Sequence, residues 1–190
     1  MFTKYTSIVS IVLCFTLFSM LQVNANEQVD FRAPGVVTYN QLDPESQKQV
    51  DCLARNIYFE SAGEGVVGWL AVGMVTMNRV GNEYYPKTVC DVVYQKIKYT
   101  YQFSWVQFKD TMKIKMPTMY NEILAMATEL YQAHETTFDV TGGALFFHSV
   151  AINPGWSGVI KTKQIGRHIF YRSGRIKPTQ PIIKHKYEKN

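Results

Sequence analysis

Two glutamates, four positions apart, are the residues of this sequence best suited to acid–base chemistry. Glu60 ends an apolar segment with helical spacing, and Glu64 follows it on a short polar turn between two glycines. Burial raises the pKa of a carboxyl group, so the group stays protonated near neutral pH and can donate a proton to a leaving oxygen. Glu60 is therefore a candidate general acid; the competing interpretation is a solvated glutamate at a helix end.

Glu64 allows two interpretations. It could be the second carboxylate of a glycosidase pair. It could equally hydrogen-bond the backbone at the start of the following helix, where negative charge is favoured. Its position between two glycines, directly before the second apolar segment, favours the structural role.

A run of aromatic and polar side chains is typical of a sugar-binding surface. Gln102 and Ser104 alternate with aromatic residues up to Trp105. Aromatic rings stack on the apolar face of a sugar, while amide and hydroxyl groups bind its polar edge. Trp156, which follows a Pro-Gly turn, is a second candidate stacking platform. A plain core role is the alternative for both.

The histidines do not form a metal-binding pattern. His148 and His168 lie in segments that resemble strands, where each could position substrate or assist proton transfer, or simply be satisfied inside a hairpin. Together with His134 and His185 they form neither HExxH nor another tight ligand pair. We therefore expect no metal and no cofactor, and the pattern disfavours zinc amidases and zinc peptidases.

Amphipathic helices are expected to position these residues. Asp43 as N-cap and Pro44 at the first helical position begin a helix that ends at the glycines around Glu64. A second helix is expected from about 66 to 80, with Val67 on its buried side. The other expected elements of this part are a short helix at 88–95, a surface loop at 99–115 and a long helix at 118–134.

The pattern changes in the last third of the chain. Residues 144–150 and 165–171 are rich in strand-forming residues, and Asn153 to Gly155 has turn chemistry. We expect these two strands to pair. The predicted fold class is α+β, with helices first and a small antiparallel ribbon after them.

The termini differ from the rest in composition. Lys4, an apolar run at 7–21 and small residues before Asn26 are typical of a secretory signal; an uncleaved anchor and a buried N-terminal helix are the alternatives. The predicted organisation is a signal peptide at 1–25, a leader arm at 26–42, one folded domain at 43–172 and a basic tail at 173–190.

Charge and cysteine content both agree with export. The net charge of +5 favours anionic partners, namely wall polymers or a membrane surface bound through the basic tail. No DNA-binding motif is visible, so nucleic acid is not an expected partner. Cys52 and Cys90 remain after signal removal, and a bridge between them would stabilise the fold by about 4 kcal/mol. Two buried free thiols are the alternative.

Several of these motifs occur together in one known family. They run in order along roughly 51–171: the segments 53–60, 63–64, 78–80, 102–105, 144–148 and 165–171, with Gly68, Pro154 and Trp156 between them. In this the chain resembles the SleB/CwlJ type of spore-cortex-lytic cell-wall hydrolase, found in bacteria and phages. The resemblance implies a fold like that of lysozymes and lytic transglycosylases, with 43–172 as the catalytic domain.

The resemblance also implies a function. Members cleave the glycan strand of peptidoglycan between N-acetylmuramic acid and N-acetylglucosamine, and the glutamate matching Glu60 is their catalytic acid/base. We accordingly expect an exported lytic transglycosylase for wall remodelling or phage lysis (an endolysin), in the periplasm or the cell wall. The residues expected to bind substrate are Tyr58, Gln102, Ser104, Trp105, His148, Trp156, His168 and Tyr171.

Other functions remain open. Attack by water instead of a sugar hydroxyl would make the protein a lysozyme-type muramidase. An N-acetylmuramoyl-L-alanine amidase and a non-catalytic wall-binding module are further alternatives. The chain also departs from the family pattern, since Ser61 and Ala62 stand where many members carry Ala-Arg. That difference raises the question of what holds Glu64.

Overall fold

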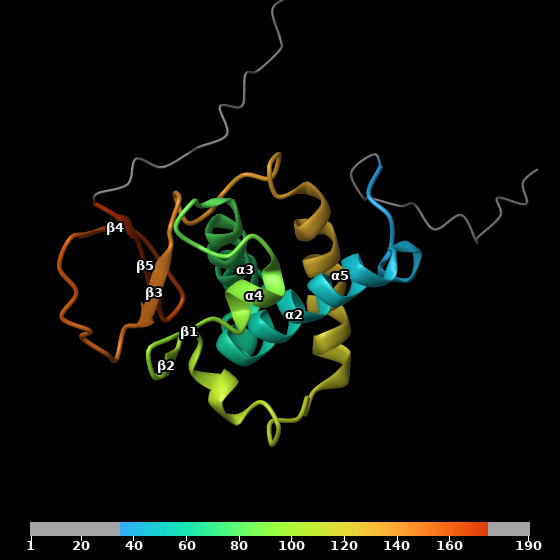
Figure 1. Cartoon of the computed structure of the whole chain (residues 1–190), viewed down its shortest axis with the longest axis horizontal. Helices are drawn as coiled ribbons and strands as arrows, with labels where there is room; N and C mark the ends of the chain where they lie inside the picture. Colours follow the sequence, from blue (N-terminus) through green and yellow to red (C-terminus); the bar gives the residue numbers. More distant parts are fainter. Residues whose placement is uncertain (1–34, 175–190) are drawn as a thin grey trace, which may run out of the picture. The chain divides into compact units, whose positions relative to one another are not determined.

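The computed structural model describes residues 35–174. In this range helices come first and a small sheet follows, so the predicted α+β class is confirmed (Figure 1). The helices are η2 (Tyr39–Gln41), α2 (Pro44–Ser61), η3 (Ala62–Glu64), α3 (Gly65–Gly81), α4 (Val89–Val93), η4 (Ser104–Phe108) and α5 (Pro117–Ala133). The strands are β1 (Lys96–Ile97), β2 (Thr100–Tyr101), β3 (Phe146–Ser149), β4 (Val159–Ile165) and β5 (His168–Ser173).

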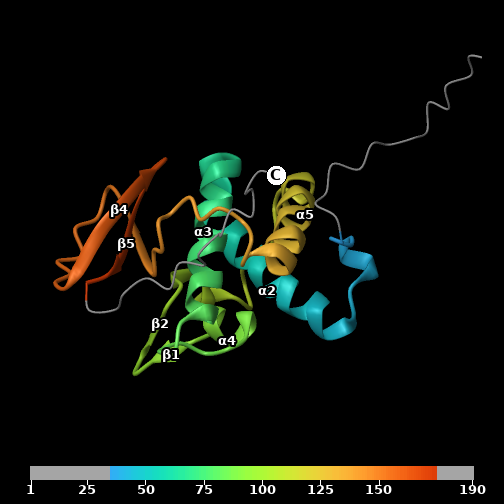
Figure 2. The same ribbon diagram turned by 90° about the horizontal axis from the view of Figure 1, so that it is seen from above.

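Helix α2 begins where the sequence predicts. The Asp43 side chain accepts hydrogen bonds from the backbone N–H groups of Glu45 and Ser46, and Pro44 occupies the first turn. This helix packs against α3, α4 and α5, and its apolar face forms the centre of the core (Figure 2). The predicted burial of Val67 is wrong: at the start of α3 its side chain is exposed.

A disulfide joins Cys52 on α2 to Cys90 on α4. The prediction of a bridge between these two cysteines is confirmed. The bridge fixes α4 beside the helix that carries Glu60. Gln49 adds a second link between the same helices, because its side-chain oxygen accepts a hydrogen bond from the backbone N–H of Cys90.

The segment predicted as a surface loop at 99–115 is partly core. Residues 100 and 101 pair with β1, and η4 follows. Within this stretch Phe103, Trp105 and Val106 are buried. The indole N–H of Trp105 donates to the side-chain oxygen of Asn56, whose amide donates in turn to the hydroxyl of Thr76. This buried chain of hydrogen bonds ties η4 to α2 and α3.

The larger of the two sheets has three strands in the order β3-β5-β4, and neighbouring strands are antiparallel. The predicted pairing of two strands is correct, but β4 was not predicted. Residue 165 ends β4, residues 166 and 167 form the β4–β5 turn, and only 168–171 of the predicted strand belong to β5. Phe147 and Phe170, which are register partners, face α3 and join the core through Ala71 and Val75. Because side chains alternate along a strand, His148 and Tyr171 face the other side.

The remaining expectations concern the ends of the chain. The predicted signal or anchor at 1–25, the first part of the leader arm and the basic tail from 175 lie outside the described residues. The described part of the arm contacts the helices: Val37 exchanges backbone hydrogen bonds with the Gln132 side chain, and the Tyr39 hydroxyl donates to Asp51. None of the described helices has the length and hydropathy to cross a membrane.

Candidate active site

Glu60 lies on the last turn of α2 with its carboxyl group largely removed from solvent. Burial raises its pKa from 4.5 to about 7, although the Arg79 charge and the backbone N–H of Ser104 act in the opposite direction. Its Oε1 is buried and has no hydrogen-bond partner within residues 35–174. An unpartnered buried carboxyl oxygen is costly to a fold, so its presence points to a ligand or a reaction there.

Arg79 is a buried cation beside Glu60, and the sequence pattern alone does not predict a role for it. It is 4% exposed, and its Nε donates to the carbonyl oxygen of Leu145 at 2.8 Å. Its guanidinium lies 5.0 Å from the ring centre of Phe103 and 5.4 Å from that of Tyr85. Burial lowers the pKa of Arg79, while Tyr85 and Glu60 raise it. Its Nη1 has no hydrogen-bond partner in the described part of the chain.

The position of Arg79 carries a signal that can be recognised in retrospect. It falls on the apolar stripe of α3, three residues after Thr76 and four after Val75, both of which are buried. A charged residue at such a position is rarely buried without a functional or structural partner. The Arg79 charge lies close enough to Glu60 to lower its pKa, and each of the two side chains has one buried atom with no hydrogen-bond partner among residues 35–174.

Glu64 has different surroundings. Its side chain is 6% exposed. It accepts a hydrogen bond from the backbone N–H of Arg167 at 2.7 Å and one from Arg167 Nε at 2.8 Å. These hydrogen bonds and the Arg167 and His168 charges lower the pKa of Glu64 below 4.5, with only burial opposing them. Glu64 is thus ionised at neutral pH and attaches the start of α3 to the β4–β5 turn.

The surrounding glycines are explained by this attachment. A Cβ at Gly166 would collide with Glu64 Oε2, and one at Gly68 would collide with the Glu64 side chain. Gly166 also has a φ of +54°, which suits the tight turn. Arg167 therefore supplies the contact to Glu64 in this chain.

An aromatic wall connects the helices to the sheet. Phe103 lies 6.4 Å from Phe147, and Phe147 lies 5.1 Å from the His168 ring, measured between ring centres. Burial lowers the pKa of His168, with Glu64 opposing this effect, and its Nδ1 is buried with no partner among the described residues. His168 is therefore available as a neutral hydrogen-bonding group on the helix-facing side of the sheet.

Two predicted substrate-binding residues have core positions instead. Trp105 is 3% exposed, and its ring centre lies 4.8 Å from that of Phe59. The faces of its indole ring are therefore not open to a sugar. The Tyr58 hydroxyl accepts hydrogen bonds from the backbone N–H groups of Lys115 and Met116. Both side chains support the end of α2 from inside the core. We correct their predicted role from substrate contact to support of Glu60.

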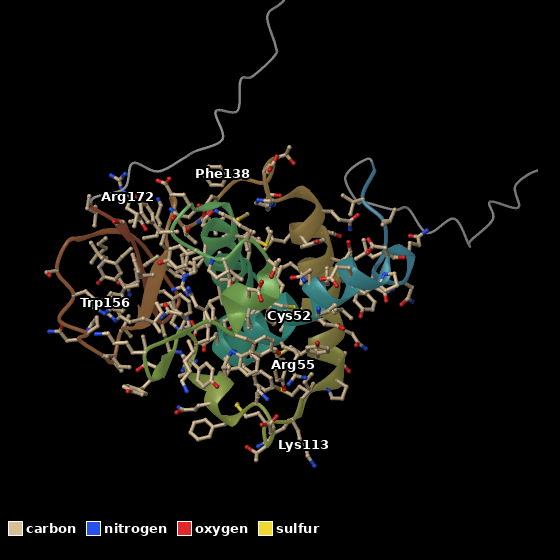
Figure 3. All side chains as sticks on the ribbon, in the orientation of Figure 1. Cys52, Arg55, Lys113, Phe138, Trp156 and Arg172 are labelled. Atoms are coloured by element: carbon tan, nitrogen blue, oxygen red, sulfur yellow. A yellow bond between two sulfur atoms is a disulfide. The ribbon has the colours of Figure 1, made fainter. Side chains whose placement is uncertain are left out.

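The other predicted site residues fall into two groups. Ser104 lies beside the Glu60 carboxyl through its backbone N–H, and Gln102 is half-buried on the same segment. His148, Trp156 and Tyr171 form a separate aromatic cluster on the outer face of the sheet. Figure 3 shows Trp156 beyond the strands, on the side away from the helices. The residues predicted to form one site therefore lie on two sides of the sheet.

Comparison with protein families identifies the class of protein. The sequence profile of the cell wall hydrolase family matches residues 63–171. The chain belongs to this family. The match contains Glu64, Arg79 and His168, and Glu60 lies three residues before it. The resemblance predicted from the sequence motifs is confirmed.

One curated relative and two solved structures are similar to parts of this chain. A spore cortex-lytic enzyme of Oceanobacillus iheyensis is 26% identical over 141 residues, which cover 72% of this chain and 46% of that protein. The chain thus spans about half the length of this curated relative. Two solved structures are similar at 26% identity. The catalytic domain of Bacillus cereus SleB has a TM-score of 0.48 and covers 66% of this chain and 91% of that domain. The catalytic domain of the germination-specific lytic transglycosylase SleB of Bacillus anthracis has a TM-score of 0.49 and covers 69% of this chain and 99% of that domain.

Proposed function

We propose that this protein cleaves the glycan strand of peptidoglycan, with Glu60 as general acid and base, and that it acts as a lytic transglycosylase. The observation that carries the proposal is the Glu60 carboxyl group, which is buried with an unpartnered oxygen and a pKa of about 7. Family membership gives the substrate class, and the Oceanobacillus relative is named for lysis of the spore cortex.

The first chemical step uses the protonated form of Glu60. With a pKa of about 7, both forms of the carboxyl group are populated near neutral pH. Glu60 donates its proton to the oxygen that links N-acetylmuramic acid to N-acetylglucosamine, and the bond from that oxygen to C1 of the muramic residue breaks. Positive charge develops on the muramic ring as the N-acetylglucosamine end leaves as an alcohol.

The second step uses the carboxylate that the first step leaves. Glu60 accepts the proton of the muramic 6-hydroxyl while that oxygen bonds to C1, giving a 1,6-anhydro product and restoring the acid. Arg79 lies close enough to interact with the Glu60 charge, so it stabilises the carboxylate between the steps. The net reaction consumes no water.

The surroundings of Glu64 favour this route over a two-carboxylate mechanism. A nucleophile or second base needs a carboxylate that faces substrate, but both oxygens of Glu64 accept hydrogen bonds from Arg167. In a lytic transglycosylase the substrate supplies the nucleophile, so one catalytic carboxylate is enough. A lysozyme-type hydrolase is the second candidate, because water could take the place of the 6-hydroxyl at the same acid.

The disulfide supports a location outside the cytoplasm. Disulfides such as Cys52–Cys90 persist in oxidising compartments, which include the periplasm and the cell surface. We propose on this basis that the protein is exported to the wall that it cleaves, for wall remodelling or phage lysis.

Digestion of purified peptidoglycan tests the proposal. The full chain and its Glu60→Gln variant are incubated with the polymer, and soluble fragments are analysed by mass spectrometry. We expect muropeptides one water lighter than hydrolysis products, and none from the variant. Fully hydrated disaccharides would establish the lysozyme-type reaction instead. New peptide N-termini without new sugar ends would indicate an amidase, and undiminished turnover by the variant would refute the role of Glu60.

A further inference from the structure

We propose that the outer face of the three-stranded sheet carries a second sugar-binding site, separate from Glu60, which holds one hexose unit of a glycan strand. The site is a pocket of about 210 Å³ between the sheet and the loop that joins β3 to β4. Its lining includes His148, Asn153, Trp156, Val159 and Tyr171. The choice of a cell-wall glycan as the ligand rests on the proposed function; the pocket itself does not.

The pocket cannot be part of the Glu60 site. Phe147 and Phe170 face α3 and the core, whereas their neighbours His148 and Tyr171 face the opposite way. Glu60, Arg79 and His168 all lie on the helix side of the sheet, where Phe147 contacts both Phe103 and His168. The sheet itself therefore separates the two groups of residues.

The aromatic residues of the pocket form a rigid and partly open platform. The rings of His148 and Tyr171 stack 5.3 Å apart with 21° between their planes. Trp156 stands nearly perpendicular to both, at 5.5 Å from His148 and 5.9 Å from Tyr171. Although it contacts three rings, Trp156 remains 44% exposed. An indole held in place and open to solvent presents the apolar surface on which a pyranose ring stacks.

The hydrogen-bonding groups of the pocket are also ordered. His148 Nδ1 lies 2.8 Å from the backbone oxygen of Ser149, which can only accept, so Nδ1 carries a hydrogen. In the neutral ring Nε2 is then the acceptor, and the Tyr171 hydroxyl 3.0 Å away donates to it. The lone pairs of the Tyr171 oxygen are left to accept from a ligand hydroxyl or amide.

Asn153 supplies the complementary group. Its Oδ1 accepts from the backbone N–H of Gly155, which fixes the side chain at the pocket, and its Nδ2 has no partner among the described residues. The pocket thus combines one fixed acceptor, one fixed donor and an aromatic face. Its volume is below the roughly 300–1,000 Å³ of pockets for drug-sized ligands, which suits a single sugar ring.

A second sugar site matters because the proposed substrate is a repeating polymer. A strand bound at the outer pocket raises the effective concentration of neighbouring units at Glu60 without a new contact at the reaction centre. The pocket is expected to lower KM for long strands and to leave the turnover of bound substrate unchanged.

The three tryptophans make the proposal testable in one experiment. Trp69 and Trp105 are buried, and their indole N–H groups donate to the Ala62 carbonyl and to Asn56, whereas Trp156 is exposed. We would titrate ¹⁵N-labelled Glu60→Gln protein with tri-N-acetylglucosamine and follow the three indole signals. The Trp156 signal is expected to shift in a saturable way. A Trp105 shift alone would mean that sugar binds only on the helix side, which overturns the proposal, as would no shift of any signal.

Matched variants complete the test. Trp156→Ala should weaken binding of the sugar about tenfold or more, and Tyr171→Phe, which keeps the ring, should weaken it several-fold. Phe138→Ala is the control, because Phe138 is 75% exposed on another part of the surface (Figure 3). Unchanged affinity in Trp156→Ala and Tyr171→Phe would overturn the proposal. Binding does not require Glu60, so failure here is distinguishable from failure of the proposed reaction.

Discussion

Glu60 and Glu64 lie four positions apart, at the end of α2 and the start of α3, yet their surroundings are opposite. The Glu60 carboxyl is buried with one oxygen unpartnered, and its pKa is about 7. Both oxygens of Glu64 accept hydrogen bonds from Arg167, which lower its pKa. Two neighbouring carboxyl groups thus acquire separate roles from their surroundings. Glu60 can exchange a proton near neutral pH, and Glu64 stabilises the fold.

Removing the proton of Glu60 should have the largest effect. Glu60→Gln keeps the shape of the side chain but cannot donate or accept the proton, so we expect activity on peptidoglycan to fall about 10³-fold or more. The measurement is the rate of release of soluble fragments. Glu122→Gln, an exposed change on α5, is the matched control and should keep full activity. A loss below tenfold in Glu60→Gln would mean that Glu60 is not the catalytic acid.

The same substitution should stabilise the fold at high pH. Because the pKa of Glu60 is raised in the folded protein, the folded state binds this proton more tightly than the unfolded state does. The stabilisation that comes with the bound proton is fully present below pH 4.5 and is lost as the pH rises through about 7. Glu60→Gln removes this loss, so above pH 8 the variant should be more stable by up to about 3 kcal/mol, and below pH 4 the two should match. Urea unfolding at several pH values checks this. Equal stability of the two proteins at all pH values would show that the pKa of Glu60 is not raised in the folded protein.

Arg79 should set where Glu60 titrates. The Arg79 charge lowers the pKa of Glu60, so its removal in Arg79→Met should raise that pKa further. Activity requires protonated Glu60 and should fall through about pH 7 in the wild type. In Arg79→Met this alkaline limb should move up by about one pH unit, equivalent to about 1.4 kcal/mol. Arg79→Lys, which keeps the charge, should hold the limb near pH 7. If the alkaline limb of the pH profile did not move in a folded Arg79→Met protein, Arg79 would have no influence on the titration of Glu60.

Glu64 should show the smallest effect, with the opposite dependence on pH. Its lowered pKa means that its stabilisation is present above 4.5 and is lost as the pH falls through the lowered value. We expect Glu64→Gln to lower stability by about 1 kcal/mol at pH 7, and by progressively less as the pH falls below 4.5. Most of the activity should remain. A loss of activity comparable to that of Glu60→Gln, with the fold intact, would instead make Glu64 the second catalytic carboxylate.

Local signals explain which parts of the fold were predictable. The cap at Asp43, the proline after it and the apolar spacing of α2 and α5 are written in neighbouring residues, so these helices were placed to within a few positions. Strand β4 was missed because it is largely exposed and contains two lysines around an irregular register at Lys161 and Lys163. Such an edge strand lacks the alternation that marks half-buried strands.

The candidate site was predictable only in part, because several of its contacts join residues that are far apart in the sequence. Glu60 and Glu64 could be selected from sequence, but the partner that decides the role of Glu64 is 103 residues away, on the β4–β5 turn. The burial of Trp105 and Tyr58 depends on how η4 and residues 115–116 fold over α2, which no local pattern encodes. His148, Trp156 and Tyr171 have the chemistry of a sugar site, but only the register of β3 and β5 shows which face they occupy.

The most direct test is to titrate the two glutamates separately. Carboxyl ¹³C signals of Glu60 and Glu64, assigned by comparison with the Glu60→Gln and Glu64→Gln variants, can be followed by NMR from pH 2 to 9. We expect Glu60 to titrate near 7 and Glu64 below 4.5. If both glutamates titrated near 4.5, or if Glu64 had the higher value, the division of roles between acid and anchor would be contradicted.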